Sequence, residues 1–523
     1  MLFFFTVIGL LIIGSLLCMN HAGSIAFATL GGLNGLVWEP LLWADNVSYF
    51  VLLMLSICYG YAYFYNIHYF SGSSQGEDLS KIVFLFVSVM ATLVLTGDFL
   101  GTLILWEYLG VVSFFLILFY SNYLSLRSSV VTLVSSRFGD VCLFIIIAVS
   151  GYLLQDSLVA TMLFFFVVIT KSAGFPFVSW LLEAMRAPTP VSSLVHSSTL
   201  VAAGVWFSMR YDISFYTGDV SILVISLCVT ILLTGVCCFF FLDLKKIVAL
   251  STCNNISWCI LYLLFGDVCL SLFQLVSHGV SKCLLFMLVG DVMSGSSGSQ
   301  ASNAVYMPRF YGNWGLFGLF SVVLGLSGAP FVGVFFTKHF LLSEFGHSVN
   351  ICLWGFIIFC VFISYFYSFR LCSILSNNFL SSVSGVLFSF ESGMIVFLWL
   401  MVNLFTAMLL DEKAGVSTYI SSLLLLFQAV SCISAYLMYN SSAMTSWSSS
   451  LFGCDNLVEA VYSIYNSIVG MSVLFYYRWD NYIIRLYSGY GATSLSLHNQ
   501  YTLNLTMSSL LLFLTWWFIL YNY

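Results

Sequence analysis

Apolar runs of about twenty residues recur along the whole chain, and this feature limits the fold more than any other. A run of that length crosses the ~30 Å hydrocarbon core of a bilayer as a helix. A helix satisfies its own backbone hydrogen bonds, which an open sheet in lipid cannot do. Only 7% of the 523 residues are charged and 61% are hydrophobic, whereas soluble domains carry about 25% charged residues. We therefore predict an all-α, polytopic membrane protein.

Hydropathy predicts about 15–16 transmembrane helices. The predicted spans lie near residues 3–18, 47–67, 81–98, 100–120, 130–153, 158–183, 190–210, 218–240, 246–265, 267–291, 312–345, 351–372, 391–410, 417–439 and 503–521. A shorter apolar piece near 25–43 is either a further span or a re-entrant segment. The net charge of -6 gives no sign of nucleic-acid binding.

Proline is rare in this chain, and its positions are informative. Three of the six prolines lie between Lys171 and residue 190, and a fourth, Pro330, precedes Lys338. Because proline removes an amide donor and clashes with the preceding turn, both places should be broken helices. Two interrupted spans in corresponding positions are typical of inverted-repeat transporters. We predict two inverted half-units, each with a broken helix and a lysine.

The C-terminal end has a different composition. Residues 455–488 mix apolar and aromatic side chains with Arg478, Asp480 and Arg485, as in an amphipathic helix that lies along a surface. A final anchoring span, Leu503–Tyr521, follows. The predicted organisation is N-terminal transmembrane helices in 1–99, the first half-unit in 100–240, the second in 241–372, further transmembrane helices in 373–454, the lateral helix region in 455–502 and the terminal anchor in 503–523.

Charged groups inside the spans are the first functional candidates. Such a group costs about 2.5–3.5 kcal/mol at the centre of a membrane helix. Glu107, Lys171, Lys282 and Lys338 all lie in strongly apolar surroundings. Burial disfavours the charged form of both lysine and glutamate, so Glu107 and Lys171 can form a switchable proton pair. The alternative is a static buried salt bridge.

Two histidines are embedded beside these groups. His278 and Lys282 are four residues apart and share a helix face. His196 follows the double-proline break. Both histidines can relay protons, although a buried histidine can also be a structural group.

The other buried charges look secondary in the sequence. Arg137 and Asp140 are three apart and can pair with each other, while Lys245 and Lys246 should reach the membrane interface from the edge of a span. The chain carries no dinucleotide fingerprint and no Walker loop. We expect no cofactor, metal or redox centre in this chain.

A dozen short motifs over about 45–345 resemble the antiporter-like membrane subunits of respiratory complex I, NADH:ubiquinone oxidoreductase. They include Trp106-Glu107, Arg137-Phe138-Gly139-Asp140, Lys171-Ser172-Ala173, Pro188-Thr189-Pro190, His196-Ser197-Ser198-Thr199, Asp243-Leu244-Lys245-Lys246, His278 with Lys282, and Phe336-Thr337-Lys338. Within that family, the lateral helix and final anchor are similar to the subunit 5 branch.

The resemblance implies a proton-translocating subunit that relays protons and holds no redox centre itself. Glu107 and Lys171 would form the first half-channel, His196, His278 and Lys282 the central relay, and Lys338 the terminal site. FMN, iron–sulfur clusters and ubiquinone would lie in partner subunits. The partners would be other membrane-arm subunits, especially the neighbouring antiporter-like one, and lipids. Abundant phenylalanine suggests a T-rich coding sequence, which favours the mitochondrial inner membrane.

Two departures from the family pattern and two alternatives accompany this hypothesis. Gln274 stands where the family often has another histidine, and His339 follows Lys338 where an aspartate is usual. The second change removes a negative partner and could retune Lys338. The alternatives are a subunit of a multi-subunit cation/proton antiporter and a membrane scaffold whose buried charges merely pair.

Overall fold

In the computed structural model the described residues are 23–26, 31–33, 36–71, 73–149, 158–211, 221–305, 312–329, 332–348, 351–376, 390, 392–409, 418–439, 454–487 and 490–521. The span predicted near 3–18 lies outside them. The chain divides into two compact units, Met1–Cys454 and Asp455–Tyr523. Each unit is described by itself.

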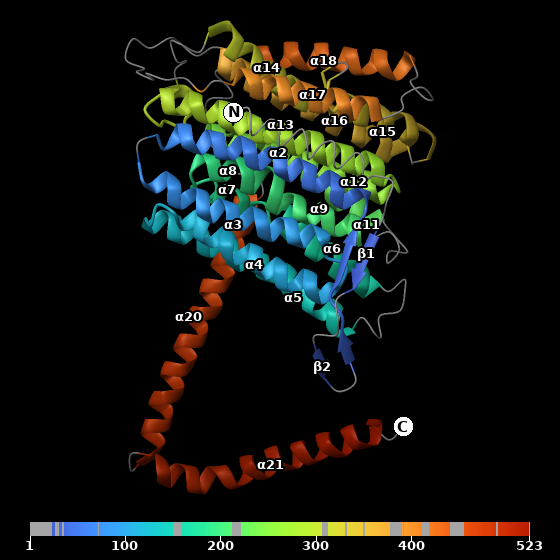
Figure 1. Cartoon of the computed structure of the whole chain (residues 1–523). Coiled ribbons are helices and arrows are strands. Elements are labelled where there is room, and N and C mark those ends of the chain that lie inside the picture. Colours follow the sequence, from blue (N-terminus) through green and yellow to red (C-terminus); the bar gives the residue numbers. More distant parts are fainter. Residues whose placement is uncertain are drawn as a thin grey trace. The chain divides into compact units, whose positions relative to one another are not determined.

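The first unit is a bundle of helices that run side by side (Figure 1). They are α2 (Asn46–Tyr69), α3 (Gln75–Leu95), α4 (Phe99–Leu118), α5 (Tyr123–Val149), α6 (Leu158–Ser172), α7 (Ser179–Ala184), α8 (Thr189–Leu194), the π-helix η1 (Val195–Thr199), α9 (Leu200–Arg210), α11 (Ser221–Phe240), α12 (Leu244–Leu264), α13 (Val268–Gly295), the 3-10 helix η2 (Ser302–Ala304), α14 (Gly312–Ser327), α15 (Phe335–Ser348), α16 (Ile351–Ser376), α17 (Gly393–Leu409) and α18 (Thr418–Tyr439).

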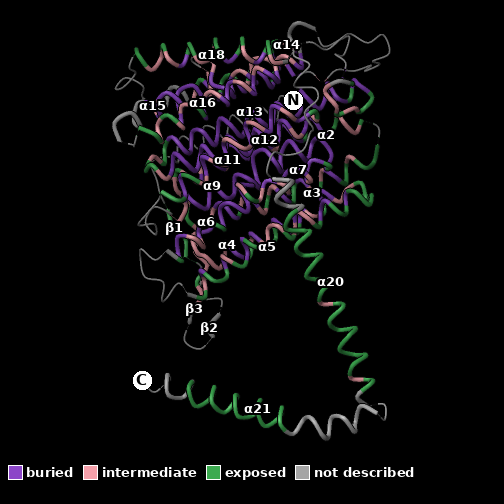
Figure 2. Tube along the Cα trace, turned by 180° about the vertical axis from the view of Figure 1, so that it is seen from behind, coloured by how far each residue is buried: buried purple, intermediate pink, exposed green. Residues whose placement is uncertain are grey.

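The predicted class, an all-α polytopic membrane protein, is confirmed. Within the described residues, ten helices are long and apolar enough to cross a membrane, counting Thr189–Arg210 as one, and three more apolar helices are shorter. Figure 2 shows the buried residues concentrated in the middle of the bundle. There α12, α13 and the Thr189–Arg210 helix are buried over nearly their whole length.

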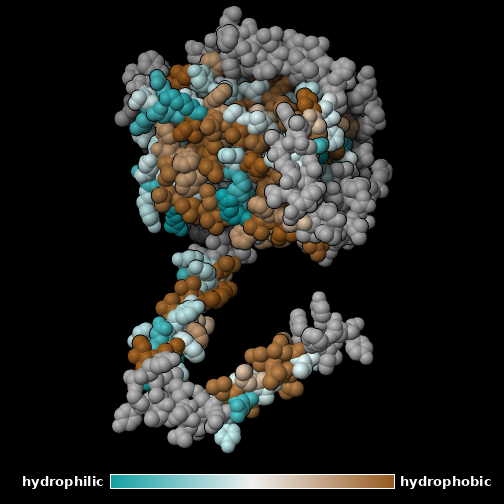
Figure 3. Space-filling view, turned by 60° about the horizontal axis from the view of Figure 1, so that its bottom comes forward, coloured by the Kyte–Doolittle hydropathy of each residue, from teal (hydrophilic) through white to brown (hydrophobic). Residues whose placement is uncertain are grey.

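The outer helices present hydrophobic side chains outward. Figure 3 shows a face of the first unit on which hydrophobic side chains predominate. On α5 the exposed side chains include Val134, Phe138 and Phe144. Exposed apolar area of this extent suits lipid tails or neighbouring subunits rather than water.

The prediction of a span or re-entrant segment near 25–43 is wrong. The described part of this segment forms two short antiparallel pairs. Strand β1 (Gly23–Ala26) pairs with β4 (Leu41–Ala44), with Gly23 opposite Ala44, and β2 (Gly31–Leu33) pairs with β3 (Leu36–Trp38). Glycine is a poor helix former, and strand pairing satisfies backbone groups that an interrupted helix would leave open.

The two interruptions predicted from proline are present. The first separates α6 from α8, and the chain then passes through η1 before the regular helix resumes. The second lies between α14 and α15, where Gly328 and Gly333 have φ of 94° and 59°. A Cβ on Gly333 would stand 2.7 Å from the carbonyl oxygen of Gly325. Only glycine fits this crossing without a shift of the backbone.

The second unit consists of α20 (Cys454–Tyr487) and α21 (Tyr490–Tyr521). The bounds of α20 match the helix predicted over 455–488. The final helix begins at Tyr490, well before the predicted Leu503, because the polar residues between them include no proline to prevent a helix. The described side chains of both helices are almost all exposed.

Arg210 ties the end of α9 to three other parts of the bundle. Its guanidinium donates to Asp45 Oδ2 at 2.7 Å, to the Val94 carbonyl at 2.8 Å and to the Trp43 carbonyl at 3.3 Å. Asp45 also caps α2 by accepting from the Ser48 amide at 2.9 Å. The side chain of Arg210 is only 2% exposed. These contacts therefore fix the start of α2, the end of α3 and strand β4 against α9.

We predict that Arg210→Met destabilises the bundle by about 1–3 kcal/mol, because Asp45 loses its buried partner. Thermal inactivation of the assembled protein measures the effect. Lys81→Met is the matched control, since the Lys81–Asp78 pair is 74% and 70% exposed and such pairs contribute little. Equal thermal stability of the two variants would contradict this account of Arg210.

Candidate functional site: buried lysines and histidines

The first group of buried charges is a row of alternating sign on α4, α5 and α6. Arg137 is paired with Glu107 and its Nη1 lies 3.5 Å from Asp140 Oδ2. Asp140 Oδ1 lies 3.9 Å from Lys171 Nζ. The side chains of Asp140 and Lys171 are buried, while those of Arg137 and Glu107 are partly exposed. Among the described residues, Glu107 therefore pairs with Arg137, and not directly with Lys171 as predicted.

The helices α5 and α6 approach closely at this row because Gly139 has no side chain. A Cβ at Gly139 would collide with the hydroxyl of Thr170, the residue before Lys171. The ammonium of Lys171 also lies 5.0 Å from the ring centroid of Trp106, where the face of an indole attracts a cation. Arg137 and Asp140, which looked secondary in the sequence, thus connect Glu107 to Lys171.

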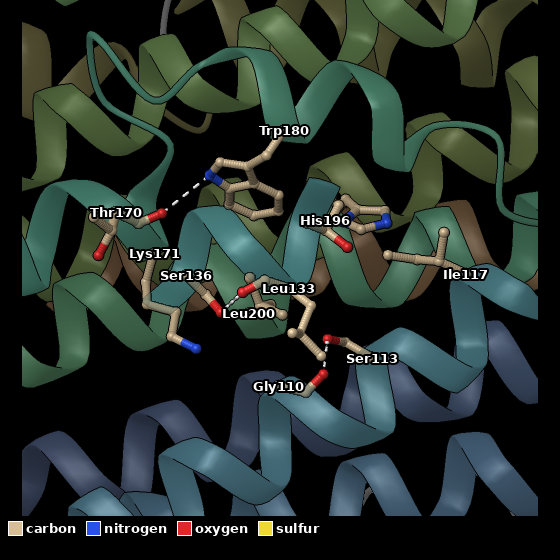
Figure 4. Close-up of a pocket in the computed structure, with 11 residues that line it drawn as sticks. Gly110, Ser113, Ile117, Leu133, Ser136, Thr170, Lys171, Trp180, His196 and Leu200 are labelled. Atoms are coloured by element: carbon tan, nitrogen blue, oxygen red, sulfur yellow. Dashed lines mark hydrogen bonds between the residues drawn. The ribbon is translucent and has the colours of Figure 1, made fainter. Parts of the chain in front are cut away.

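A small cavity joins Lys171 to His196 (Figure 4). Its volume is about 10 Å³, and both residues line it together with Ser113, Ser136 and Trp180. Figure 4 shows Lys171 and His196 on either side of it. A cavity of this volume can hold one water molecule. A hydroxyl-lined space of this size is large enough for one bridging water.

His196 lies on the π-helix η1, in the second arm of the first broken helix. Single-turn π-helices inside α-helices occur frequently at functional sites. The imidazole is fully buried, and neither ring nitrogen has a hydrogen-bond partner among the described residues. Its ring stands edge-on to Trp180, with centroids 6.4 Å apart. The nitrogens remain available to a proton donor or acceptor.

Lys245 is a site residue that the sequence reasoning missed. It was predicted to reach the interface, but its side chain is buried and Nζ donates to the Ala187 carbonyl at 3.3 Å. Lys246 is partly exposed and pairs with Asp243 at 3.4 Å. Consecutive residues on a helix point about 100° apart. Nothing in the sequence shows which of the two lysines faces the bundle.

The central relay candidates lie on α13. His278 and Lys282 are both fully buried or nearly so. Lys282 Nζ donates to the Val248 carbonyl at 3.3 Å and to the Ser251 hydroxyl, both on α12. Within the described part of the chain, both ring nitrogens of His278 are without a hydrogen-bond partner. Lys282 is therefore held by neutral oxygen atoms.

Gln274 links the central helices to the second broken helix. The hydroxyl of Thr337 donates to its Oε1 at 2.6 Å, and its Nε2 donates to Asn255 Oδ1 at 3.5 Å. Thr337 immediately precedes Lys338. An amide that cannot titrate at neutral pH thus stands between His278 and Lys338, in place of the family's histidine.

Lys338 lies in the first turn of α15, just after the break that follows α14. Its Nζ donates to the Ser327 carbonyl at 2.6 Å and to the Ser364 hydroxyl at 2.7 Å, and lies 4.5 Å from the Tyr365 ring centroid. Ser327 ends α14, and the last carbonyls of a helix lack intrahelical donors. The next residue, His339, contacts the Ser421 hydroxyl at 2.9 Å through Nε2. Lys338 is thus held by neutral groups.

Comparison with known proteins places this bundle in a family. Residues 96–366, about half of the chain, match the family described as NADH:quinone oxidoreductase/Mrp antiporter, TM. One similar curated protein is NADH-ubiquinone oxidoreductase chain 5 of Ascaris suum, which is 32% identical over 71% of this chain and 69% of its own length. Another is chain 5 of Locusta migratoria, which is 32% identical over 63% of this chain and 58% of its own length. That of Mytilus edulis is 34% identical over 57% of this chain and 55% of its length.

Two solved structures share the fold. The Mrp complex from Dietzia sp. aligns with a TM-score of 0.67 and 19% identity, covering 92% of this chain and 59% of that one. The archaeal membrane-bound sulfane sulfur reductase aligns with a TM-score of 0.62 and 15% identity, covering 82% of this chain and 92% of that one. At these identities the likeness concerns the fold alone.

The bundle with two broken helices and buried lysines belongs to the antiporter-like class of membrane subunits. The chain is a member of the NADH:quinone oxidoreductase/Mrp antiporter transmembrane family, and its curated relatives are complex I chain 5 proteins. The matches to the Locusta and Mytilus proteins span less than two thirds of those proteins.

We predict one ordered water in the cavity between Lys171 and His196. It should contact an imidazole nitrogen of His196, because a buried polar group without a partner is costly. A cryo-EM map of the assembled complex at a resolution that shows waters would test this. A dry cavity, with His196 bonded elsewhere, would contradict it.

Proposed function

We propose that this chain is a proton-translocating membrane-arm subunit of NADH:ubiquinone oxidoreductase. The observation that supports it most strongly is the way the buried lysines are held. Lys171 has a carboxylate partner, whereas Lys245, Lys282 and Lys338 are held by carbonyl and hydroxyl oxygens. Four amines buried in one apolar bundle are costly, which favours a function for them over chance.

Neutral partners suit proton transfer better than a static role. A buried ammonium bonded to a carboxylate, as in Lys171, gives up its proton only when the charge of the carboxylate is neutralised or moved at the same time, since an unpaired buried anion is costly. An ammonium bonded to a carbonyl and a hydroxyl can do so, since the neutral amine leaves no charge behind. Lys338 and Lys282 are of this kind. The scaffold alternative, in which buried charges merely pair, does not account for them.

The proposed path follows the contacts from one half-unit to the other. The first part is the row of charges Glu107, Arg137, Asp140 and Lys171. Moving one of these charges changes the electrostatic energy of its neighbour in the row. The central part of the path consists of two histidines and two lysines, His196, Lys245, His278 and Lys282. Gln274 and Thr337 lead to Lys338, with His339 beside it at the far end.

The energy would come from electron transfer in partner subunits, which hold FMN, the iron–sulfur clusters and ubiquinone. A change of charge or hydration in the neighbouring antiporter-like subunit would shift the Glu107–Arg137–Asp140–Lys171 row. The chain would then lie in the mitochondrial inner membrane, surrounded by other membrane-arm subunits and lipid. The reductase activity belongs to the assembly.

A second candidate is a subunit of a multi-subunit cation/proton antiporter. This alternative is supported by the structural alignment with the Mrp complex, which extends over most of this chain. The curated relatives at about a third identity are complex I proteins. Co-purification with flavin and iron–sulfur subunits would decide for the first function, and purification with antiporter subunits alone would decide for the second.

The test is Lys171→Met in the assembled complex. NADH-driven proton pumping should fall by about tenfold or more, because a positioned proton-transfer group contributes at least ~10²-fold where its step limits the rate. Lys81→Met on the exposed face of α3 is the matched control and should pump normally. Normal pumping by an assembled Lys171→Met complex would refute the relay.

A further inference from the structure

A histidine and an aspartate pair at the ends of α2 and α13, outside the path described above. His68 Nε2 lies 3.3 Å from Asp291 Oδ1. The side chain of His68 is 26% exposed, whereas that of Asp291 is 1% exposed. His68 thus connects the surface of the bundle to a carboxyl group buried inside it.

The buried side of Asp291 faces hydroxyl groups. Its Oδ2 has no hydrogen-bond partner among the described residues. The next residue back, Gly290, has no side chain, and a Cβ there would collide with the Tyr65 hydroxyl and stand 3.4 Å from Thr189 Cβ. Tyr65 and Asp291 also interact electrostatically. Gly290 therefore lets two hydroxyl-bearing side chains approach α13. Among the described residues, Tyr65 Oη and Thr189 Oγ1 have no hydrogen-bond partner either, so neither is bonded directly to Asp291.

The hydroxyl groups lead inward to Lys245. Thr189 begins α8, and two residues before it the Ala187 carbonyl accepts from Lys245 Nζ at 3.3 Å. Lys245 in turn acts electrostatically on His196. One helical turn along α12 from Lys245, the Val248 carbonyl accepts from Lys282. The segment around Thr189 therefore leads to Lys245, which lies one helical turn from the carbonyl that holds Lys282.

A purely structural role explains this pair poorly. Asp291 lies in the last turns of α13, where the negative end of the helix dipole disfavours a carboxylate. One of its oxygens is buried without a partner, which costs stability. Histidine exchanges protons near neutral pH. A buried carboxyl group with one free oxygen is here joined to a partly exposed histidine, which links the interior of the bundle to its surface.

We propose that His68 and Asp291 form a proton port, which connects the aqueous phase at this end of the bundle to the central relay. This inference rests on the proposed function. A proton on His68 Nε2 passes to the Asp291 carboxylate, leaving neutral imidazole. It then moves to the neutral amine of Lys245 by exchange along the Tyr65 and Thr189 hydroxyls and the water molecules that must join them, since these hydroxyls have no direct partner among the described residues. Only N–H and O–H bonds form and break, and the same steps run in reverse for release.

The test uses Asp291→Asn and His68→Ala in the assembled complex, with proton pumping measured against NADH oxidation. Both should lower pumping by roughly tenfold. Asp78→Asn is the matched control, because Asp78 pairs with Lys81 at 3.0 Å on an exposed face. Added imidazole should restore pumping to His68→Ala, since a small base can take the place of the missing side chain. A merely structural role would show no such rescue.

The outcomes separate the port from the function it serves. If both variants pump as Asp78→Asn does while Lys171→Met does not, the port is wrong and the relay stands. If Lys171→Met also pumps normally, both are wrong. Should Asp291→Asn fail to assemble, His68→Ala decides alone: rescue by imidazole supports the port, and loss of pumping without rescue overturns it.

Discussion

The cost of holding an ammonium group inside an apolar bundle governs this structure. Each buried lysine needs oxygen atoms, and the carbonyls of an intact helix are already bonded along that helix. Lys282 shares one such carbonyl, that of Val248 in α12, and adds the Ser251 hydroxyl. The interruptions supply the oxygen atoms for the other two lysines that neutral groups hold. Lys338 is bonded to the last residue of α14, and Lys245 to the carbonyl just before the proline that starts the α8 segment. The broken helices and the buried lysines therefore belong together.

Lys171 satisfies the same need in another way. It has a buried carboxylate, Asp140, which in turn approaches Arg137 and through it Glu107. Four charges of alternating sign in low dielectric are strongly coupled, so a change at the exposed end reaches Lys171 at the buried end. His196 lies beyond the small cavity, and its ring nitrogens have no partner among the described residues. The buried lysines that follow in the proposed path are held by neutral groups. Under the proposed function, the first half would respond to charge and the second would pass protons on.

Hydropathy and proline were enough to predict the all-helical class and the broken helices, because these depend on composition along the chain. The family was predicted from its short motifs, which are local in sequence. They could not predict which face of a helix packs inward. Lys245 and Lys246 look alike in sequence, yet only Lys245 is buried. Gly139 brings Asp140 to Lys171, a contact that no spacing indicates. The strands in 23–44 were missed because short apolar stretches do not distinguish span from hairpin. The domain boundaries and residue roles stay predictions.

The central claim is that Asp140, rather than Glu107, sets the charge of Lys171. The most direct test compares protons pumped per NADH in assembled complexes that carry Asp140→Asn or Glu107→Gln. We predict the larger loss for Asp140→Asn, since it removes the carboxylate next to Lys171, whereas Glu107→Gln leaves Arg137 paired with Asp140. A larger loss for Glu107→Gln, with Asp140→Asn close to normal, would contradict the account.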